Sequence, residues 1–172
     1  MRHDVKRLRL ILWIFVLMAT AADAFPVIVV VRHAEKASAG GNDPELSVAG
    51  QKRAEALSRI LKDAQITAVF VTEFKRTQQT AAPTARAAHL SPTVLPAGDI
   101  PGLVAKLRAV NGNVLVVGHS NTMPDLMKAL GITTPVTIPE DDYTEIFLVS
   151  LADPPQLLRL HYPFRQTVSI GR

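Results

Sequence analysis

The stretch Val27-Ile28-Val29-Val30-Val31-Arg32-His33 decides the fold of this chain. Its five consecutive β-branched residues predict a short strand that is buried on both faces, as strands of parallel sheets are. Arg32 and His33 follow directly, so they stand at the carboxyl end of that strand. In open α/β sheets this edge is where ligands bind. A guanidinium beside an imidazole at this edge predicts a site for an anionic substrate.

A second strand-to-histidine unit lies in the other half of the chain. The apolar run Val114-Leu115-Val116-Val117 leads into Gly118-His119-Ser120-Asn121. If the two strands are parallel neighbours, their carboxyl ends meet at one edge of the sheet. We therefore expect His33 and His119 to lie together there.

A second arginine reaches the same edge from a third unit. The strand predicted over 66–72 leads into a helix that begins around Lys75, with Arg76 in its first turn. Guanidinium groups match phosphate oxygens, and the amides of a helix N-terminus add further donors. An unprotonated imidazole can attack phosphorus, and a second one can stabilise the charge that develops on the oxygens. Arg32, His33, Arg76 and His119 therefore predict a site for phosphoryl transfer.

The rest of the chain alternates strands and helices. We expect helices over 47–63, 75–88, 99–110 and 123–130, with Ser47 as the first N-cap and Pro83 kinking or breaking the second helix. Further strands are expected over 94–95, 145–151 and 157–162. The pattern predicts an α/β fold: a three-layer sandwich with a mostly parallel central sheet, helices on both faces and a C-terminal antiparallel edge hairpin.

The helix over 47–63 has two predicted faces. Its apolar stripe comprises Ala54, Leu57, Ile60, Leu61 and Ala64, and its charged residues, mostly assigned to solvent, are Lys52, Arg53, Glu55, Arg59 and Lys62.

The first 24 residues predict a secretory signal peptide. They combine a basic start, the short apolar run 10–19 and a small-residue cleavage pattern, Ala22-Asp23-Ala24. The apolar run is shorter than the roughly 20 residues that a membrane span requires. We therefore expect one catalytic domain over 25–172 in the periplasm or outside the cell, with no stable membrane insertion after cleavage. The alternative is an uncleaved N-terminal anchor.

Composition narrows the classes of partner. Of the 19 basic and 15 acidic residues, four and two lie before residue 25, which leaves 15 basic against 13 acidic in the domain. With no basic tract, nucleic acid is not an expected partner. The sequence has no cysteine, so disulfides and thiolate metal sites are excluded. The oligomeric state is left open.

Four motifs resemble those of the histidine phosphatase superfamily, the phosphoglycerate mutase-like clan. Val31-Arg32-His33-Ala34-Glu35-Lys36 resembles its R-H-G/A-E motif, and Leu46-Ser47-x-x-Gly50 is similar to its first helix start. The run Phe74-Lys75-Arg76-Thr77-Gln78-Gln79-Thr80-Ala81 resembles the second-arginine motif, and Val117-Gly118-His119-Ser120-Asn121 the second-histidine motif. They occur in the family's order and cover most of residues 27–130.

The resemblance implies a function. By it, His33 is the phosphorylated nucleophile, Arg32 and Arg76 bind the phosphoryl group, and His119 completes the pocket. Such enzymes are phosphoric ester hydrolases that use no metal and no other cofactor. The short spacing between the motifs favours the small phosphatase branch over a mutase. The implied substrate is a small phosphomonoester or phosphoramidate.

The acid that would protonate the leaving group is not assigned. Glu73, Asp99, Glu140, Asp141 and Asp142 are candidates, and the small phosphohistidine phosphatases lack an evident acid because a phosphoramidate needs less help. The acids 140–142 are otherwise interpreted as a solvated turn whose loop can reach the pocket.

The remaining polar residues near the motifs have simpler interpretations. Glu35 either orients Arg32 or is a solvated loop acid. His89 and His161 are expected at the surface or at the sheet edge.

Two other functions fit parts of the sequence. One is a domain that keeps the pocket and binds a phosphorylated ligand without turnover. The other is a serine hydrolase, because Gly118-His119-Ser120-Asn121-Thr122 approaches a nucleophile elbow. Asp141 or Asp153 and then His161 follow in the required order. Thr122 in place of the last glycine argues against this second interpretation.

Overall fold

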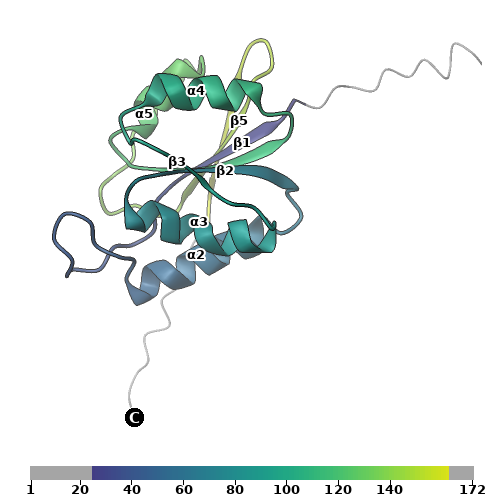
Figure 1. Cartoon of the computed structure of the whole chain (residues 1–172). Coiled ribbons are helices and arrows are strands. Elements are labelled where there is room, and N and C mark those ends of the chain that lie inside the picture. Colours follow the sequence, from purple (N-terminus) through teal and green to yellow (C-terminus); the bar gives the residue numbers. More distant parts are fainter. Residues whose placement is uncertain (1–24, 163–172) are drawn as a thin grey trace, which may run out of the picture.

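The computed structural model describes residues 25–162, and the predicted signal segment 1–24 and residues 163–172 lie outside that part. Ten elements follow one another (Figure 1): β1 (Val27–Arg32), α2 (Val48–Ile60), β2 (Ile66–Thr72), α3 (Lys75–Ala87), β3 (Thr93–Leu95), α4 (Ile100–Ala109), β4 (Asn113–Gly118), α5 (Met123–Ala129), β5 (Glu145–Ser150) and β6 (Gln156–His161). Among the described helices, none combines the length and the apolar character that crossing a bilayer requires.

The strands form one sheet in the order β3-β2-β4-β1-β5-β6. Strands β1 to β4 are mutually parallel wherever they pair, whereas β5 and β6 are antiparallel to their neighbours. The predicted mostly parallel sheet with an antiparallel edge hairpin is confirmed. β1 lies directly beside β4, with Arg32 opposite Gly118, so the two strand-to-histidine units end side by side.

Helices cover both faces of the sheet, which confirms the three-layer arrangement. Figure 1 shows α2 and α3 on one face and α4 and α5 on the other. Side chains of β1 alternate between the two cores: Ile28 and Val30 pack with the α4–α5 layer, and Val29 and Val31 with the α2–α3 layer. All four are almost fully buried. At about 1.5–3 kcal/mol for each buried aliphatic side chain, this explains why the strand is apolar from Val27 to Val31.

The first two helices differ in detail from the sequence prediction. Ser47 caps α2 by accepting from the Gly50 amide at 3.1 Å, as expected, but the helix ends at Ile60. Ile60, assigned to the apolar stripe, is 51% exposed. α3 continues through Pro83 without a break.

The largest correction concerns Arg53, which was assigned to the solvent face of the helix. Its guanidinium is buried and pairs with Glu35, Nε lying 2.9 Å from each carboxylate oxygen and Nη2 lying 2.6 Å from Oε1. Glu35 is therefore neither a solvated acid nor an orienter of Arg32. The ion pair instead ties the loop after β1 to α2, and the Arg53 guanidinium also stacks over the Tyr162 ring at 5.5 Å.

The packing around Gly50 explains why the first helix-start motif has a glycine at this position. A Cβ at this position would collide with the backbone carbonyl of Glu35. Because no side chain fits, the first turn of α2 packs directly on the loop that carries His33. The Ser47 amide donates to the Glu35 carbonyl at 2.9 Å and adds to this attachment.

The buried ion pair should contribute strongly to stability. We expect Glu35→Gln to lower the free energy of unfolding by about 3 kcal/mol, because the buried Arg53 guanidinium then loses the carboxylate that pairs with it directly. Urea denaturation measures this difference. Glu55→Gln on the same helix is the matched control, since Glu55 faces solvent and lies 4.0 Å from an exposed Arg59. Equal stabilities of the two variants would contradict this role of the pair.

Candidate active site

His33 and His119 meet at the carboxyl edge of the sheet, as the sequence predicts. Their ring centroids are 5.3 Å apart with an interplanar angle of 61°. The His33 amide donates to the Gly118 carbonyl at 2.9 Å, so the parallel ladder of β1 and β4 continues to the histidines. Both residues are 5% exposed. The hydrogen-bonded backbone and the surrounding protein together fix where the two rings lie.

One hydrogen bond sets the tautomer of His33. Its Nδ1 lies 2.8 Å from the carbonyl oxygen of Ala34. A carbonyl only accepts, so Nδ1 carries the hydrogen, and Nε2 of the neutral ring keeps its lone pair. No partner of Nε2 lies within the described residues. The ring is thus oriented with a free nitrogen, the form that a nucleophilic imidazole requires.

The end of β2 positions His119. Its Nε2 lies 3.0 Å from the Thr72 hydroxyl, which in turn lies 3.0 Å from the Thr77 hydroxyl. The Thr77 hydroxyl also donates to the Phe74 carbonyl at 2.8 Å. The Phe74 ring packs edge-on against His119, with centroids 5.3 Å apart. Sequence reasoning missed Thr72, because a threonine at a strand end carries no signal of its own.

Arg32 is held by the loop before β5. Its Nη1 donates to the carbonyls of Pro139, Glu140 and Asp142 at 2.7–3.2 Å, and its Nη2 pairs with Glu140 Oε2 at 3.0 Å. The guanidinium also stacks over the Tyr143 ring at 4.4 Å. Its Nε is buried and has no hydrogen-bond partner in the described part of the chain. Nε is therefore the nitrogen of Arg32 that these loop contacts leave without an acceptor.

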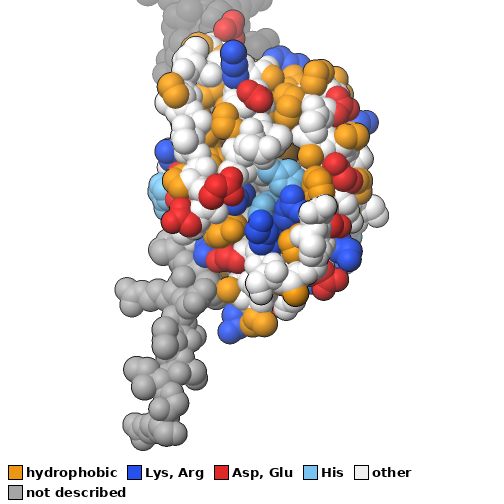
Figure 2. Space-filling view, turned by 90° about the vertical axis from the view of Figure 1, so that its left-hand side faces the viewer, with side chains coloured by type: hydrophobic (Ala, Val, Ile, Leu, Met, Phe, Trp, Pro, Cys, Tyr) orange, Lys and Arg blue, Asp and Glu red, His pale blue; other side chains and the backbone are white. Residues whose placement is uncertain are grey.

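Arg76 comes from the first turn of α3, as predicted, and stacks over the Phe74 ring at 4.3 Å. Its side chain is 15% exposed. Asp43, from the loop after β1, lies 3.9 Å from Arg76 Nη1 and accepts from the Lys75 amide at 2.9 Å. Asp43 thus caps α3 beside Arg76. The sequence gives no signal of this contact, because Asp43 and α3 are far apart along the chain. In Figure 2, imidazoles lie recessed beside basic side chains.

The surroundings keep both histidines neutral. Burial, together with the positive charges of Arg32 and Arg76, lowers the pKa of His33 to about 4, and the same causes lower the pKa of His119 to about 4. The unfolded chain titrates near the ordinary value of 6.5. The stability that the neutral rings contribute is therefore present above pH 6.5 and is lost as the pH falls towards 4.

Glu140 is the candidate acid nearest to the predicted site residues. Besides its pair with Arg32, its Oε1 accepts from the Ser120 hydroxyl at 2.8 Å. That hydrogen bond and Arg32 lower the pKa of the Glu140 carboxyl, although the side chain is 82% exposed. The loop of acids 140–142 therefore reaches the pocket.

The other candidate acids have partners elsewhere or face solvent. Asp99 caps α4 by accepting from the Gly102 amide, and Glu73 accepts from the Ala97 amide. Asp142 accepts from Thr144, and Asp141 is exposed. None of these side chains bonds to Arg32, His33, Arg76 or His119 within residues 25–162.

Fold and site together define an α/β protein with a cationic, two-histidine pocket at the carboxyl edge of its sheet. The sequence profile of the histidine phosphatase superfamily (branch 1) matches residues 28–97. The chain is similar to this superfamily over the segment that carries Arg32, His33 and Arg76. No curated protein matches the chain in sequence.

Solved structures share the fold. The protein histidine phosphatase SixA complexed with tungstate superposes with a TM-score of 0.65 at 22% identity, covering 78% of this chain and 96% of that one. A mycobacterial glucosyl-3-phosphoglycerate phosphatase complexed with VO3 gives 0.61 at 16% identity, covering 80% and 98%. A SixA described as a putative phosphohistidine phosphatase from Nakamurella multipartitia gives 0.57 at 23%, covering 79% and 95%.

The depressed pKa values of His33 and His119 are directly measurable. In a pH titration followed by NMR, we expect the ring protons of both histidines to shift with midpoints near pH 4, because burial disfavours the charged imidazole. The same protein in urea supplies the control, with imidazoles titrating near pH 6.5. Midpoints above pH 6 in the folded protein would contradict the arrangement described for this pocket.

Proposed function

We propose that this protein is a phosphatase that hydrolyses a phosphomonoester or a phosphoramidate through a phosphohistidine intermediate on His33. The observation that carries the proposal is the pairing of two free groups: the Nε2 of His33, left unprotonated by the Nδ1 bond to Ala34, and the buried, unpartnered Nε of Arg32. A nucleophile and an anion-binding donor are thus adjacent in sequence and at the same sheet edge.

The first step transfers the phosphoryl group to the protein. The lone pair on His33 Nε2 forms a bond to phosphorus, and the bond from phosphorus to the leaving oxygen or nitrogen breaks with its electron pair on the leaving atom. Arg32 and Arg76 offset the charge on the phosphoryl oxygens.

His119 acts beside the phosphoryl group. In the tautomer in which Thr72 donates to Nε2, the hydrogen of His119 lies on Nδ1 and can be donated to a phosphoryl oxygen. A water molecule then attacks the phosphorus of phospho-His33. The bond to Nε2 breaks, inorganic phosphate leaves, and the imidazole regains its lone pair.

The state of Glu140 favours substrates with a good leaving group. Its hydrogen bond from Ser120 and the charge of Arg32 keep its pKa below the ordinary value, so it is anionic and is not a proton donor in this arrangement. A phosphoramidate or an activated phosphate ester needs less protonation than an alkoxide does. Among the proposed substrates, we therefore favour phosphoramidates and activated phosphate esters over esters with an alkoxide leaving group.

The serine hydrolase alternative lacks its central contact. The Ser120 hydroxyl donates to the Glu140 carboxylate, and no imidazole nitrogen hydrogen-bonds to it within residues 25–162. His161 instead lies beside Thr144 at the end of β6. The alternative of a binding domain without turnover uses the same pocket and is separated by experiment.

Removing the nucleophile should abolish turnover. We expect His33→Ala to hydrolyse an aryl phosphate at least about 10³-fold more slowly than the unmodified protein, because loss of a covalent nucleophile removes the lower-barrier route. His89→Asn is the matched control, since His89 is exposed and its φ of 56° suits asparagine.

The intermediate itself can be trapped. Rapid quenching should yield phosphate bound to the protein that is labile in acid, stable in base and absent from His33→Ala. Undiminished turnover by His33→Ala would contradict the mechanism. Phosphate binding without turnover across aryl phosphates, sugar phosphates and phosphohistidine would instead favour the binding domain.

We further propose that the protein is exported and acts in the periplasm or outside the cell. The support is the basic start, apolar run and Ala22-Asp23-Ala24 pattern of the sequence. We expect mass spectrometry of the protein from a secretion-competent bacterial host to show Phe25 as the mature N-terminus. Ala22→Asp and Ala24→Asp together should block cleavage, because the signal site requires small residues. An N-terminus at Met1 in the unmodified protein would contradict cleavage.

A further inference from the structure

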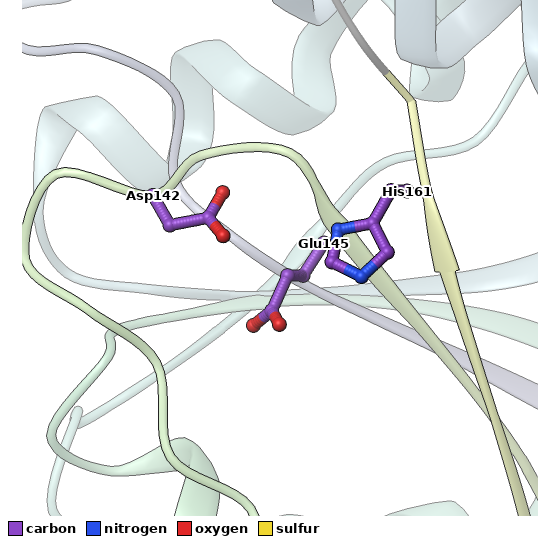
Figure 3. A group of neighbouring side chains, drawn as sticks. All are labelled: Asp142, Glu145 and His161. Atoms are coloured by element: carbon purple, nitrogen blue, oxygen red, sulfur yellow. The ribbon is translucent and has the colours of Figure 1, made fainter.

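A second group of chemically active side chains lies beside the pocket, at the open end of the β5–β6 hairpin. Asp142 ends the loop that holds Arg32, Glu145 begins β5, and His161 ends β6 directly across from Glu145. Figure 3 shows the three side chains as neighbours on these segments. One ligand atom from each lies within 4.8 Å of the other two. The proposed phosphatase mechanism uses none of these side chains.

Glu145 is the most buried member of this group. Its side chain is 6% exposed, and its Oε2 is buried with no hydrogen-bond partner in the described part of the chain. Its Oε1 has only a 3.5 Å contact to Arg159 Nε. A buried carboxylate oxygen without a donor is costly unless something compensates it. It therefore points to a cationic partner.

Thr144 holds the other two side chains in place. Its hydroxyl donates to Asp142 Oδ1 at 2.7 Å and lies 3.2 Å from His161 Nδ1. The Thr144 amide also donates to Asp142 Oδ1 at 2.7 Å. Asp142 Oδ2 has no partner within residues 25–162. Such orientation of ligating side chains by neighbouring hydrogen bonds is typical of metal sites.

The charges also favour a cation. The carboxylates of Asp142 and Glu145 are close enough to interact electrostatically, and Arg159, which pairs with Glu145, is 39% exposed. Imidazole together with carboxylates is a donor set that suits zinc and related first-row divalent ions. Tetrahedral zinc at about 2.0–2.1 Å from each atom requires ligand atoms about 3.3 Å apart. Asp142 and His161 are not fully buried, so their side chains can close the remaining gap.

We propose that Asp142, Glu145 and His161 form a binding site for a divalent metal ion of the zinc type, separate from the two-histidine pocket. The ion would join the loop over 139–143 to the end of β6. Because the Asp142 carbonyl accepts from Arg32 Nη1, Asp142 belongs both to the proposed metal site and to the support of the arginine that we propose binds phosphate. The proposal does not depend on the phosphatase function, since metal binding is measured without substrate.

Calorimetric titration of the full chain, without a polyhistidine tag, with ZnCl₂ tests the site. We expect one zinc ion to bind, and Glu145→Gln and His161→Ala each to weaken binding by about tenfold or more. Glu55→Gln and His89→Asn are the matched controls and should bind as the unmodified protein does. Arg159→Ala should bind at least as tightly, because a competing cation is removed. Cobalt(II) in place of zinc should give the intense visible absorption of a tetrahedral site.

Two results would overturn the proposal. One is the absence of zinc binding at 1:1 stoichiometry by the unmodified protein. The other is binding that Glu145→Gln and His161→Ala leave unchanged, which would place the ion elsewhere. Thermal unfolding of each variant without metal verifies that it is folded, so a weakened affinity is not caused by unfolding.

Discussion

The parallel pairing of β1 with β4 is the constraint on which the rest of this structure depends. Its register places Arg32 opposite Gly118 and ends in the hydrogen bond from the His33 amide to the Gly118 carbonyl. Two histidines that are 86 residues apart thereby share one edge of the sheet. The ladder is buried on both faces, so its position is fixed by the two hydrophobic cores and not by the site. Because this scaffold is rigid, it can hold the side chains at its edge in the positions that a reaction requires.

Around that edge, each proposed phosphoryl-handling group is held by backbone or by short polar side chains. The Ala34 carbonyl orients His33, Thr72 holds His119, and the carbonyls of the loop before β5 hold Arg32. Thr80 joins two of these units, because its hydroxyl accepts from the Ala34 amide and donates to the Arg76 carbonyl. These contacts leave His33 Nε2 and Arg32 Nε without a hydrogen-bond partner among the described residues. Burial and the two arginines then keep both imidazoles neutral.

The segment over 139–145 links the pocket to the proposed metal site. Its backbone carbonyls bind Arg32, the Tyr143 ring stacks on that guanidinium, and Glu145 begins β5 with a buried, unpartnered oxygen. In sequence the segment shows three consecutive acids, which predict a solvated turn whose loop can reach the pocket. Its function follows from the carbonyl oxygens, which every residue has, and so composition gives no signal of it. The same reason applies to Thr72 and Asp43, ordinary residues whose roles come from their neighbours.

The sequence by itself determined the α/β class, the order of strands and helices, the edge hairpin and the four side chains that meet at the sheet edge. It could do so because strand burial, helix periodicity and strand-end residues are local patterns, and because parallel strands bring their ends together. Tertiary structure alone decided that Arg53 is buried against Glu35 and that Glu140 lies over Arg32. It also decided that Glu145 faces His161 across the last hairpin. These are contacts between charged groups distant in sequence, and whether a charge is solvated or paired depends on which surfaces the completed fold brings together.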